Sequence, residues 1–479
     1  MRRVVVIGVV VLAALTPVTG TAAQPSTIPQ NIVLILTDDQ VFNTLRFMPH
    51  VVSLLQAHGV TFTNAFDNNP LCCPTRTTIL TGLTSGHNGV WTNNPATSGG
   101  FPTFVANGDQ NRQIFLWLHD LGYRTAFIGK FLNFYNVSDD AWILPGVDEW
   151  HVFNLENLAH TGCEVGGYYG TCYSDNGTLV HHPASEYSTS ETGNEVVSFI
   201  TDNDDPSSPL FIEYAPRAPH LPTVPIPAYR TRCPNVPKIT SRATFNKVIV
   251  NGPAYTKALP WWNAKKTAEQ QTLWRRDCQT LLSVDNQVGR IVTALKNTGR
   301  LQNTLLVFAS DNGYLFGQHR WLGKEVPYES SIRVPVVVRD DAVIPPAMQG
   351  TTVNAQITSL DYTPTFLQAA GASRTLDGQS LFPLFDGNGT WIPQDPLLIE
   401  HVQGPTPGSV APTYCGVRAS GFMYAQYATG EEELYDLTED PLERTNVAAD
   451  PAYASVLANL RARTHLLCDP TPPGFTWTH

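Results

Sequence analysis

Acidic and amide side chains follow two apolar segments that lie far apart in the chain. Residues 31–36 and 304–309 are short, β-branched runs typical of buried strands, and each ends in a polar cluster. These clusters contain Asp38, Asp39, Asp311 and Asn312. Three carboxylates and an amide offer only oxygen ligands, and this donor set favours Ca²⁺, with Mg²⁺ as the alternative. The Asp38-Asp39 pair alone is equally typical of a strand-end turn or helix cap, so the metal site depends on the two clusters meeting.

A second set of residues could attack an anionic ester and neutralise its charge. Cys72 and Cys73 are adjacent, but only Cys72 has Pro at +2 and Arg76 at +4, and Leu-Thr-Gly follows at positions 80–82. Three further candidates are Lys130, His220 and Lys324. A lone Lys or His is usually solvated or structural. Together these residues would give an acidic chain the local positive charge that an anionic substrate needs.

Five short apolar runs predict strands that would carry many of these residues. They lie at 31–36, 123–128, 209–214, 304–309 and 335–338, and helical patterns lie between them at 48–58, 114–121, 195–202, 274–295 and 363–370. This alternation predicts an α/β fold with a mostly parallel central sheet sandwiched by helices. Ligands of such sheets bind beyond the carboxyl ends of the strands, where polar residues follow almost every run.

The rest of the chain predicts loops over the site and a smaller second domain. Residues 135–190 are rich in Gly, Asn, Tyr and Asp with little periodicity, and we expect long loops there and over 233–262. From residue 394 onward, short apolar pieces separated by turns predict a small antiparallel sheet, closed by a helix over 452–467. The expected domains are therefore 28–393 and 394–479.

The N-terminus predicts export. Arg2 and Arg3 precede an apolar run over 4–15, and small residues at 21–23 are typical of a cleavage site, so residues 1–23 are interpreted as a signal peptide. The alternative is an N-terminal membrane anchor, although the run is short for a span. No later stretch is long and apolar enough to span a bilayer, so no stable membrane insertion is expected, and the mature protein should be secreted.

Composition excludes other classes of protein. A hydrophobic content of 42% in 479 residues excludes intrinsic disorder, and the formal net charge of -11 argues against a nucleic-acid partner.

The stretch from Cys72 to Gly82 resembles the signature of the formylglycine-dependent sulfatases of the alkaline phosphatase superfamily. In that family a formylglycine-generating enzyme oxidises the cysteine to formylglycine (3-oxoalanine), so the resemblance implies that Cys72 is modified and Cys73 is not. The alternative is a structural pair of thiols. The resemblance also implies that one Ca²⁺ is held by Asp38, Asp39, Asp311, Asn312 and modified Cys72. The residues implied to act on the sulfate ester are Arg76, Lys130, His220 and Lys324.

Further segments resemble the branch of N-acetylglucosamine-6-sulfatases and extracellular endosulfatases. They include the double cysteine, the Asn-Asn pair after His87, Gly-Lys-Phe-Leu-Asn at 129–133 and the segment 274–285. The resemblance implies a 6-O-sulfated N-acetylglucosamine-type substrate, with an aryl sulfate as the alternative. Candidates for polar contacts with substrate are His87, Asn93, Asn94 and Asn133. One departure is Leu132, since many arylsulfatases carry His there, and this leaves the base for breakdown of the sulfo-enzyme unassigned.

The mechanism implied by the family uses the hydrated aldehyde. One hydroxyl of the gem-diol attacks sulfur, His220 or Lys324 protonates the leaving alcohol, and the second hydroxyl then re-forms the aldehyde and expels sulfate. Two other functions stay open. One is phosphonate or phosphate monoester hydrolysis, which some members of the superfamily catalyse. The other is binding of sulfated glycans without catalysis.

Export also predicts disulfide bonds. The chain has eight cysteines, and modification of Cys72 would leave an odd number, with Cys73 as the natural unpaired one. The expected pairs are Cys163–Cys172, Cys233–Cys278 and Cys415–Cys468, among many possible connectivities.

Overall fold

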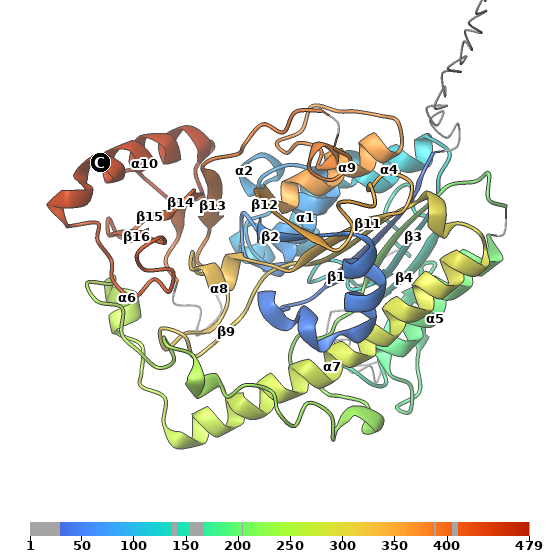
Figure 1. The fold of residues 1–479 in the computed structure, drawn as a ribbon, viewed down its shortest axis with the longest axis horizontal. Helices are drawn as coiled ribbons and strands as arrows, with labels where there is room; N and C mark the ends of the chain where they lie inside the picture. Colours follow the sequence, from blue (N-terminus) through green and yellow to red (C-terminus); the bar gives the residue numbers. More distant parts are fainter. Residues whose placement is uncertain are drawn as a thin grey trace, which may run out of the picture.

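The larger of two principal sheets carries the site. The computed structural model describes residues 29–136, 141–153, 167–203, 205–387, 389–404 and 411–478. Within them, a sheet of 10 strands has the order β12-β2-β11-β8-β1-β7-β3-β4-β5-β6, with helices on both faces (Figure 1). Its strands are β1 (Asn31–Thr37), β2 (Val60–Phe66), β3 (Arg124–Gly129), β4 (Glu149–Phe153), β5 (Cys172–Asp175), β6 (Thr178–His181), β7 (Leu210–Ala215), β8 (Thr304–Ser310), β11 (Val336–Asp340) and β12 (Thr351–Thr358).

The central strands are parallel and buried on both faces. β1 pairs in parallel with β7 and β8, and Thr37 lies opposite Ser310. Ile32, Leu34 and Leu36 of β1 pack into one hydrophobic core, whereas Val33 and Ile35 pack into another. Because successive side chains of a strand point to opposite faces, a continuous apolar run is needed here, and this explains the absence of a polar alternation.

Helices cover each of these cores. The first core includes residues of α1 (Cys72–Thr81), α4 (Ile114–Asp120) and α9 (Tyr362–Ala369). The second includes residues of α5 (Ser188–Asp202) and the long α7 (Ala264–Asn297). Shorter helices are α2 (Ser85–Asn88), α3 (Gly100–Ala106), α6 (Ala254–Lys257) and α8 (Glu329–Ile332). The helical segment predicted over 48–58 is confirmed, and it consists largely of a π-helical turn (Val51–Leu55) followed by a 3-10 turn (Gln56–His58).

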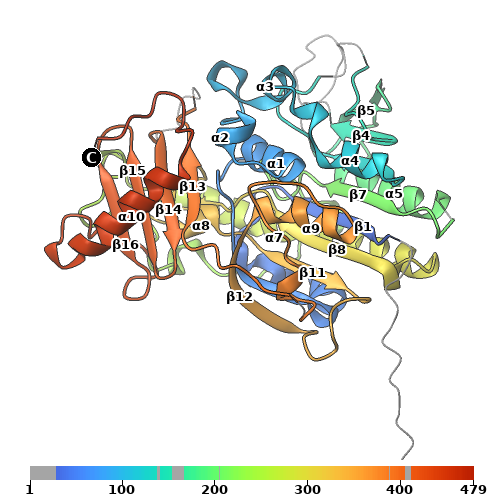
Figure 2. The ribbon, with the colours of Figure 1, turned by 90° about the horizontal axis from the view of Figure 1, so that it is seen from above.

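The C-terminal part forms a second sheet beside the first (Figure 2). Its antiparallel strands are β13 (Leu397–His401), β14 (Tyr414–Ala419), β15 (Phe422–Tyr427) and β16 (Glu432–Asp436), and α10 (Ala454–Leu467) packs on it. A two-stranded pair, β9 (Leu315–Phe316) and β10 (Leu322–Gly323), lies near the site. The predicted fold class is confirmed, while the domain boundary at residue 394 stays a prediction.

Two sequence expectations have different outcomes. The segment 135–190 is not only loops, because β4, β5 and β6 extend the sheet with antiparallel pairs at β4–β5 and β5–β6.

The cysteine pairs Cys233–Cys278 and Cys415–Cys468 are present, and Cys72 and Cys73 are free. Cys172 is disulfide-bonded, but its predicted partner Cys163 lies outside the described residues, as does the predicted signal peptide.

No described helix combines the length and the apolar character that a bilayer crossing requires.

Candidate active site

The ends of β1 and β8 bring the two predicted oxygen clusters together. The backbone N–H of Asp39 donates to Oδ1 of Asp311 at 3.1 Å, and Nδ2 of Asn312 donates to Oδ1 of Asp39 at 2.6 Å. Asp39 adopts a left-handed backbone (φ 66), a conformation that aspartate tolerates better than most residues. The parallel register therefore places Asp38, Asp39, Asp311 and Asn312 at one sheet edge, as the sequence predicts.

The donor set of this cluster fits a hard divalent cation. Ligand atoms of Asp38, Asp39, Cys72 and His220 all lie within 4.8 Å of one another. Oδ1 of Asn312 is buried and has no hydrogen-bond partner among the described residues, and such an oxygen needs a partner to offset its burial. Carboxylate and amide oxygens prefer Ca²⁺ or Mg²⁺. The residues thus fit the metal expected from the sequence.

Cys72 is the first residue of the buried helix α1, and the geometry explains its motif. Pro74 falls in the first turn, where a backbone N–H has no intrahelical acceptor and proline is tolerated. Arg76 follows four residues after Cys72, so both side chains lie on the same helix face. Gly82 ends the helix in a left-handed conformation (φ 70). The positive end of the helix dipole therefore lies at Cys72, where negative charge is favoured.

Two lysines balance the carboxylates around Cys72. Nζ of Lys130 donates to Oδ2 of Asp38 at 2.6 Å, and Nζ of Lys324 donates to Sγ of Cys72 at 2.9 Å and also to Asp39. Burial alone would raise the pKa of Asp38, but the nearby cations, Lys130 foremost, hold it well below its usual range. Burial would lower the pKa of Lys324, but Asp39 and its neighbours raise it well above the ordinary value. Both lysines are therefore ammonium ions at neutral pH.

Arg76 contacts a metal-ligand candidate and is fully enclosed. Its Nε and Nη2 lie 2.9 and 2.8 Å from Oδ2 of Asp311, and Nη1 donates to the carbonyl of Lys130 at 2.7 Å. Burial and Asp38 raise the pKa of Asp311 to about 6, although Arg76 opposes this shift. In this arrangement Arg76 orients Asp311 and the loop of Lys130.

His220 presents one ring nitrogen to the site. Nδ1–H donates to the carbonyl of Leu221 at 2.7 Å, so Nε2 carries the lone pair and lies 3.8 Å from Oδ2 of Asp39. Burial lowers the pKa of His220 to about 4, partly opposed by Asp38 and Asp39. The imidazole is therefore a neutral acceptor at pH 7.

A small cavity beside His220 reveals residues that the sequence analysis did not assign. Asp39 and His220 share its lining with Thr223, Asp277 and Tyr314. Asp277 is only 5% exposed, and burial, followed by the charge of Asp39, raises its pKa well above the ordinary value. A carboxylate within the buried face of a helix is the sequence signal that could have identified it.

The four predicted substrate-contact residues have other neighbours in this structure. Oδ1 of Asn93 accepts from the backbone N–H of Cys73 at 2.8 Å, and the backbone N–H of Asn133 donates to Sγ of Cys73 at 3.0 Å. Asn94 caps the short turn Pro95–Thr97, and Nδ1 of His87 lies 2.7 Å from a carboxylate oxygen of Asp377. Asn93 and Asn133 thus support the start of α1. Substrate contact by any of the four stays a prediction.

Comparison with known proteins agrees with this geometry. This chain belongs to the sulfatase family, whose model matches residues 30–372. A second model, for the N-sulphoglucosamine sulphohydrolase C-terminal region, matches residues 317–468. The family resemblance seen in the cysteine motif is confirmed.

Individual relatives cover the chain to different extents. The extracellular sulfatase SULF-1 homolog of Drosophila melanogaster is 32% identical over 74% of this chain, but the match spans only 31% of that relative. The match to the Caenorhabditis elegans putative homolog spans 52% of its length, so the chain covers less than two thirds of both relatives. The N-acetylglucosamine-6-sulfatase of Homo sapiens is 30% identical, with 87% of this chain and 81% of the relative covered.

Solved structures share the fold. One, a complex with its substrate D-glucosamine-2-N,6-O-disulfate, has a TM-score of 0.76 at 24% identity and covers 93% of this chain and 99% of its own. The phosphonate monoester hydrolase of Agrobacterium radiobacter has a TM-score of 0.68 at 23% identity, covering 91% and 95%.

Proposed function

We propose that this protein is an exported sulfatase that hydrolyses sulfate esters of sugars to an alcohol and inorganic sulfate. The observation that carries the proposal is the position of Cys72. It begins α1 and lies within hydrogen-bonding reach of Lys324, beside the acidic cluster at the ends of β1 and β8. Sequence relatives named as sulfatases support the same reaction, and relatives named as extracellular sulfatases support export.

The reactive group would be made from Cys72. Its sulfur occupies the place of the aldehyde-derived oxygens that a formylglycine-generating enzyme would introduce. When bound, Ca²⁺ on Asp38, Asp39, Asp311 and Asn312 would supply Lewis-acid chemistry that lowers the pKa of an oxygen nucleophile at this position.

The protein's own cations would bind the sulfate. Lys324 already contacts the atom that stands for the nucleophile, and Lys130 contacts Asp38, whose Oδ1 lies 3.7 Å from that atom. A sulfate bound at Cys72 would therefore meet two ammonium groups. The N-terminus of α1 adds the positive end of the helix dipole at the same place. Its backbone N–H groups are mostly engaged, because that of Cys73 donates to Asn93 and Pro74 has none. Arg76 would act as a positioning residue, since its guanidinium is engaged by Asp311 and the Lys130 carbonyl. This role differs from the direct sulfate contact that the resemblance implies.

Proton transfer would involve Lys324 and His220. The alcohol of a sugar sulfate is a poor leaving group and must be protonated as it departs. Lys324 is the ammonium donor within reach of the reacting atom, whereas His220 turns an unprotonated Nε2 toward Asp39. His220 is thus suited to accept a hydrogen bond or a proton, and Lys324 to donate one.

The substrate is proposed to be a 6-O-sulfated N-acetylglucosamine-type sugar. Relatives named N-acetylglucosamine-6-sulfatase from animals and N-acetylglucosamine-6-O-sulfatase from Bacteroides thetaiotaomicron support this choice. Phosphonate or phosphate monoester hydrolysis is the second candidate, supported by the fold shared with a phosphonate monoester hydrolase.

The test combines modification and turnover. The protein is produced with a formylglycine-generating enzyme, and the intact mass of the peptide containing Cys72 is measured. Release of sulfate from N-acetylglucosamine-6-sulfate and nitrophenyl sulfate is compared with release of phosphate from nitrophenyl phosphate. We expect conversion at Cys72, sulfate release, and loss of turnover in Cys72→Ala, with Cys73→Ser as the matched active control.

Three results would overturn parts of this proposal. Full turnover by folded Cys72→Ala would remove the nucleophile assignment. Faster cleavage of the phosphate ester than of every sulfate ester would favour the second candidate. Turnover of nitrophenyl sulfate without any sugar 6-sulfate would refute the substrate alone.

A further inference from the structure

We propose that a cationic groove beside the candidate active site binds a second anionic group of a polyanionic, sulfated glycan. This inference rests on the proposed function, because it assumes that one sulfate of the same glycan occupies the site. The groove has a volume of about 440 Å³, and its polar lining comes from Arg230, Thr272, Arg275, Arg276 and Gln279. We refer to it as the arginine groove. Its lining contains three arginines and no acidic residue.

One wall of the groove, which carries Arg230, belongs to a segment of one-sided charge in an acidic chain, and the other wall, on α7, begins three residues after Glu269, which bounds this segment. Between Glu213 and Glu269 the sequence contains nine lysines and arginines and no aspartate or glutamate, although the whole chain has a formal net charge of -11. His220 belongs to this same segment. A local field of one sign in a protein of the opposite sign attracts anions to that place and repels them elsewhere.

The arginines of the groove are available to a ligand. Arg230, Arg275 and Arg276 are exposed, and none of them forms an ion pair among the described residues. Arg275 and Arg276 follow Thr272 by three and four residues on α7, so all three side chains lie on one helix face. Guanidinium groups pair with sulfate and carboxylate through two parallel hydrogen bonds.

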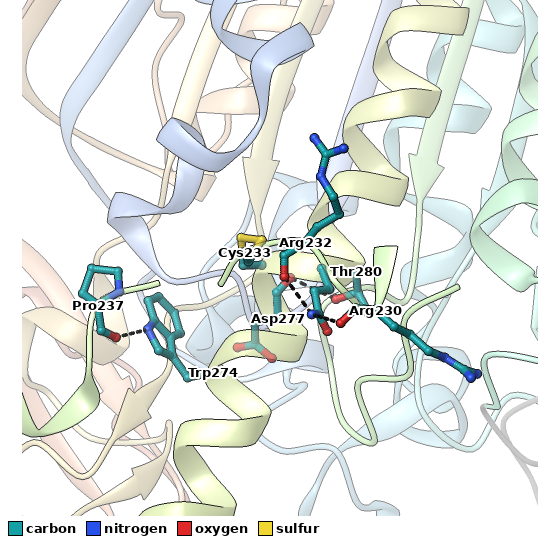
Figure 3. The surroundings of a disulfide bond; sticks show 9 residues. Arg230, Arg232, Cys233, Pro237, Trp274, Asp277 and Thr280 are labelled. Atoms are coloured by element: carbon teal, nitrogen blue, oxygen red, sulfur yellow. Dashed lines mark hydrogen bonds between the residues drawn. A yellow bond between two sulfur atoms is a disulfide. The ribbon is translucent and has the colours of Figure 1, made fainter. Parts of the chain in front are cut away.

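The segment that carries Arg230 is linked to α7 by a disulfide bond and by hydrogen bonds. The disulfide Cys233–Cys278 joins them, and Nε2 of Gln279 donates to the carbonyls of Arg230 and Arg232 at 2.8 and 2.9 Å (Figure 3). Nε1 of Trp274 donates to the carbonyl of Pro237 at 2.9 Å. Figure 3 shows the side chains of Arg230 and Arg232 extending away from the disulfide. The backbone of this wall is therefore fixed before a ligand arrives, which reduces the entropy lost on binding.

Two chain segments link the lining of the arginine groove to the lining of the small cavity at the candidate active site. Thr223 and Asp277 line the small cavity that also includes His220. Their chain neighbours Val224 and Arg276 line the arginine groove. A sugar whose sulfate lies at Cys72 would extend past His220, and the next anionic group of a glycan chain would meet the arginines. A single aryl sulfate has no such group and would not reach them.

The test measures binding directly and needs no turnover. Affinity for a fully sulfated heparin hexasaccharide is determined by calorimetry at two salt concentrations, for the wild-type chain and for Arg275→Ala/Arg276→Ala. The matched control is Lys265→Ala/Lys296→Ala, which removes two exposed charges from the same helix outside the groove. A single variant, Arg230→Ala, tests the opposite wall. Circular dichroism confirms that each variant folds.

We expect the double arginine variant to bind the hexasaccharide about tenfold more weakly and with a shallower salt dependence, because two charge-assisted contacts are lost. The lysine control should bind within about twofold of the wild type. Equal losses in both double variants, or no measurable binding by the wild type, would overturn the proposal. Equally tight binding of a single-stranded oligonucleotide of the same charge would also refute a glycan site. Because binding is read without sulfate release, an inactive enzyme that still shows these differences would refute only the proposed catalytic function.

Discussion

Replacing Arg76 by Met would test whether the site depends on its buried ion pair. The guanidinium lies 2.9 and 2.8 Å from the same oxygen of Asp311, and the two side chains are 2% and 0% exposed. Met keeps much of the apolar volume of the arginine but removes the charge. Asp311 would then remain buried beside Asp38 without its closest cation.

The size of the effect follows from two opposing contributions. Removing one partner of a buried ion pair typically costs about 3–5 kcal/mol of unfolding free energy. Burial, with Asp38, already raises the pKa of Asp311 to about 6, and loss of Arg76 would raise it further. At pH 7 the carboxyl of the variant could therefore take up a proton, and this would limit the loss. We expect a destabilisation of about 3 kcal/mol, near the lower end of that range.

The assay is urea unfolding with a chelator present, at pH 7 and at pH 5. At pH 5 Asp311 is largely protonated in the wild type as well, so the deficit of Arg76→Met should be smaller there. Arg444→Met is the control, because Arg444 is 58% exposed in its pair with Asp440, and exposed pairs contribute less than about 1 kcal/mol. A deficit of Arg76→Met that matches this control, or that is equal at both pH values, would refute the reasoning.

Three further predictions concern the metal, a disulfide and a buried acid. Because the pKa of Asp311 is about 6, Ca²⁺ must displace a proton from this carboxyl below pH 6. Calorimetry should show that the affinity for Ca²⁺ falls about tenfold per pH unit below 6. An affinity that does not change between pH 5 and 7 would contradict this. Replacing both Cys233 and Cys278, 45 residues apart, by Ala should lower the unfolding free energy by about 4 kcal/mol in chemical denaturation, and an unchanged midpoint would contradict it. Burial raises the pKa of Glu433 to about 7 despite three tyrosine hydroxyl donors. The unfolding free energy of the wild type should therefore fall as pH rises from about 4.3 to 7, and Glu433→Gln should reduce this pH dependence. The same pH dependence in both proteins would contradict this prediction.

The sequence predicts the fold best where the hydrophobic pattern of a segment matches its burial in the folded protein. The runs before Asp38 and Asp311 are buried on both faces, so they appear as unbroken apolar segments that end in polar residues. The carboxyl ends of parallel strands meet at one edge of the sheet. The sequence therefore predicts that the oxygen ligands lie together, without knowledge of any contact. The C-terminal strands were also predictable, because turns separate short apolar pieces there.

Other features depend on contacts that no local pattern records. Every residue of α1 is buried, so the helix from Cys72 to Thr81 has no polar face and no amphipathic period to reveal it. The strands β5 and β6 are short, and their sequence predicts loops, because their conformation depends on the pairing of β5 with β4 and of β6 with β5. Packing likewise decides whether the guanidinium of Arg76 contacts a substrate or Asp311.

The charge balance of the site links its architecture to its proposed chemistry. Asp38, Asp39 and Asp311 carry up to three negative charges, and Lys130, Lys324 and Arg76 carry three positive ones in direct contact with them. The neutral imidazole of His220 adds nothing to this sum at pH 7. The protein groups alone are thus close to neutral, and each cation is engaged by a carboxylate. A divalent cation in the cluster would leave an excess of positive charge beside Cys72. A binding site for an anionic ester would therefore be complete only when metal and protein cations act together, and this explains why so many carboxylates can surround a site for sulfate.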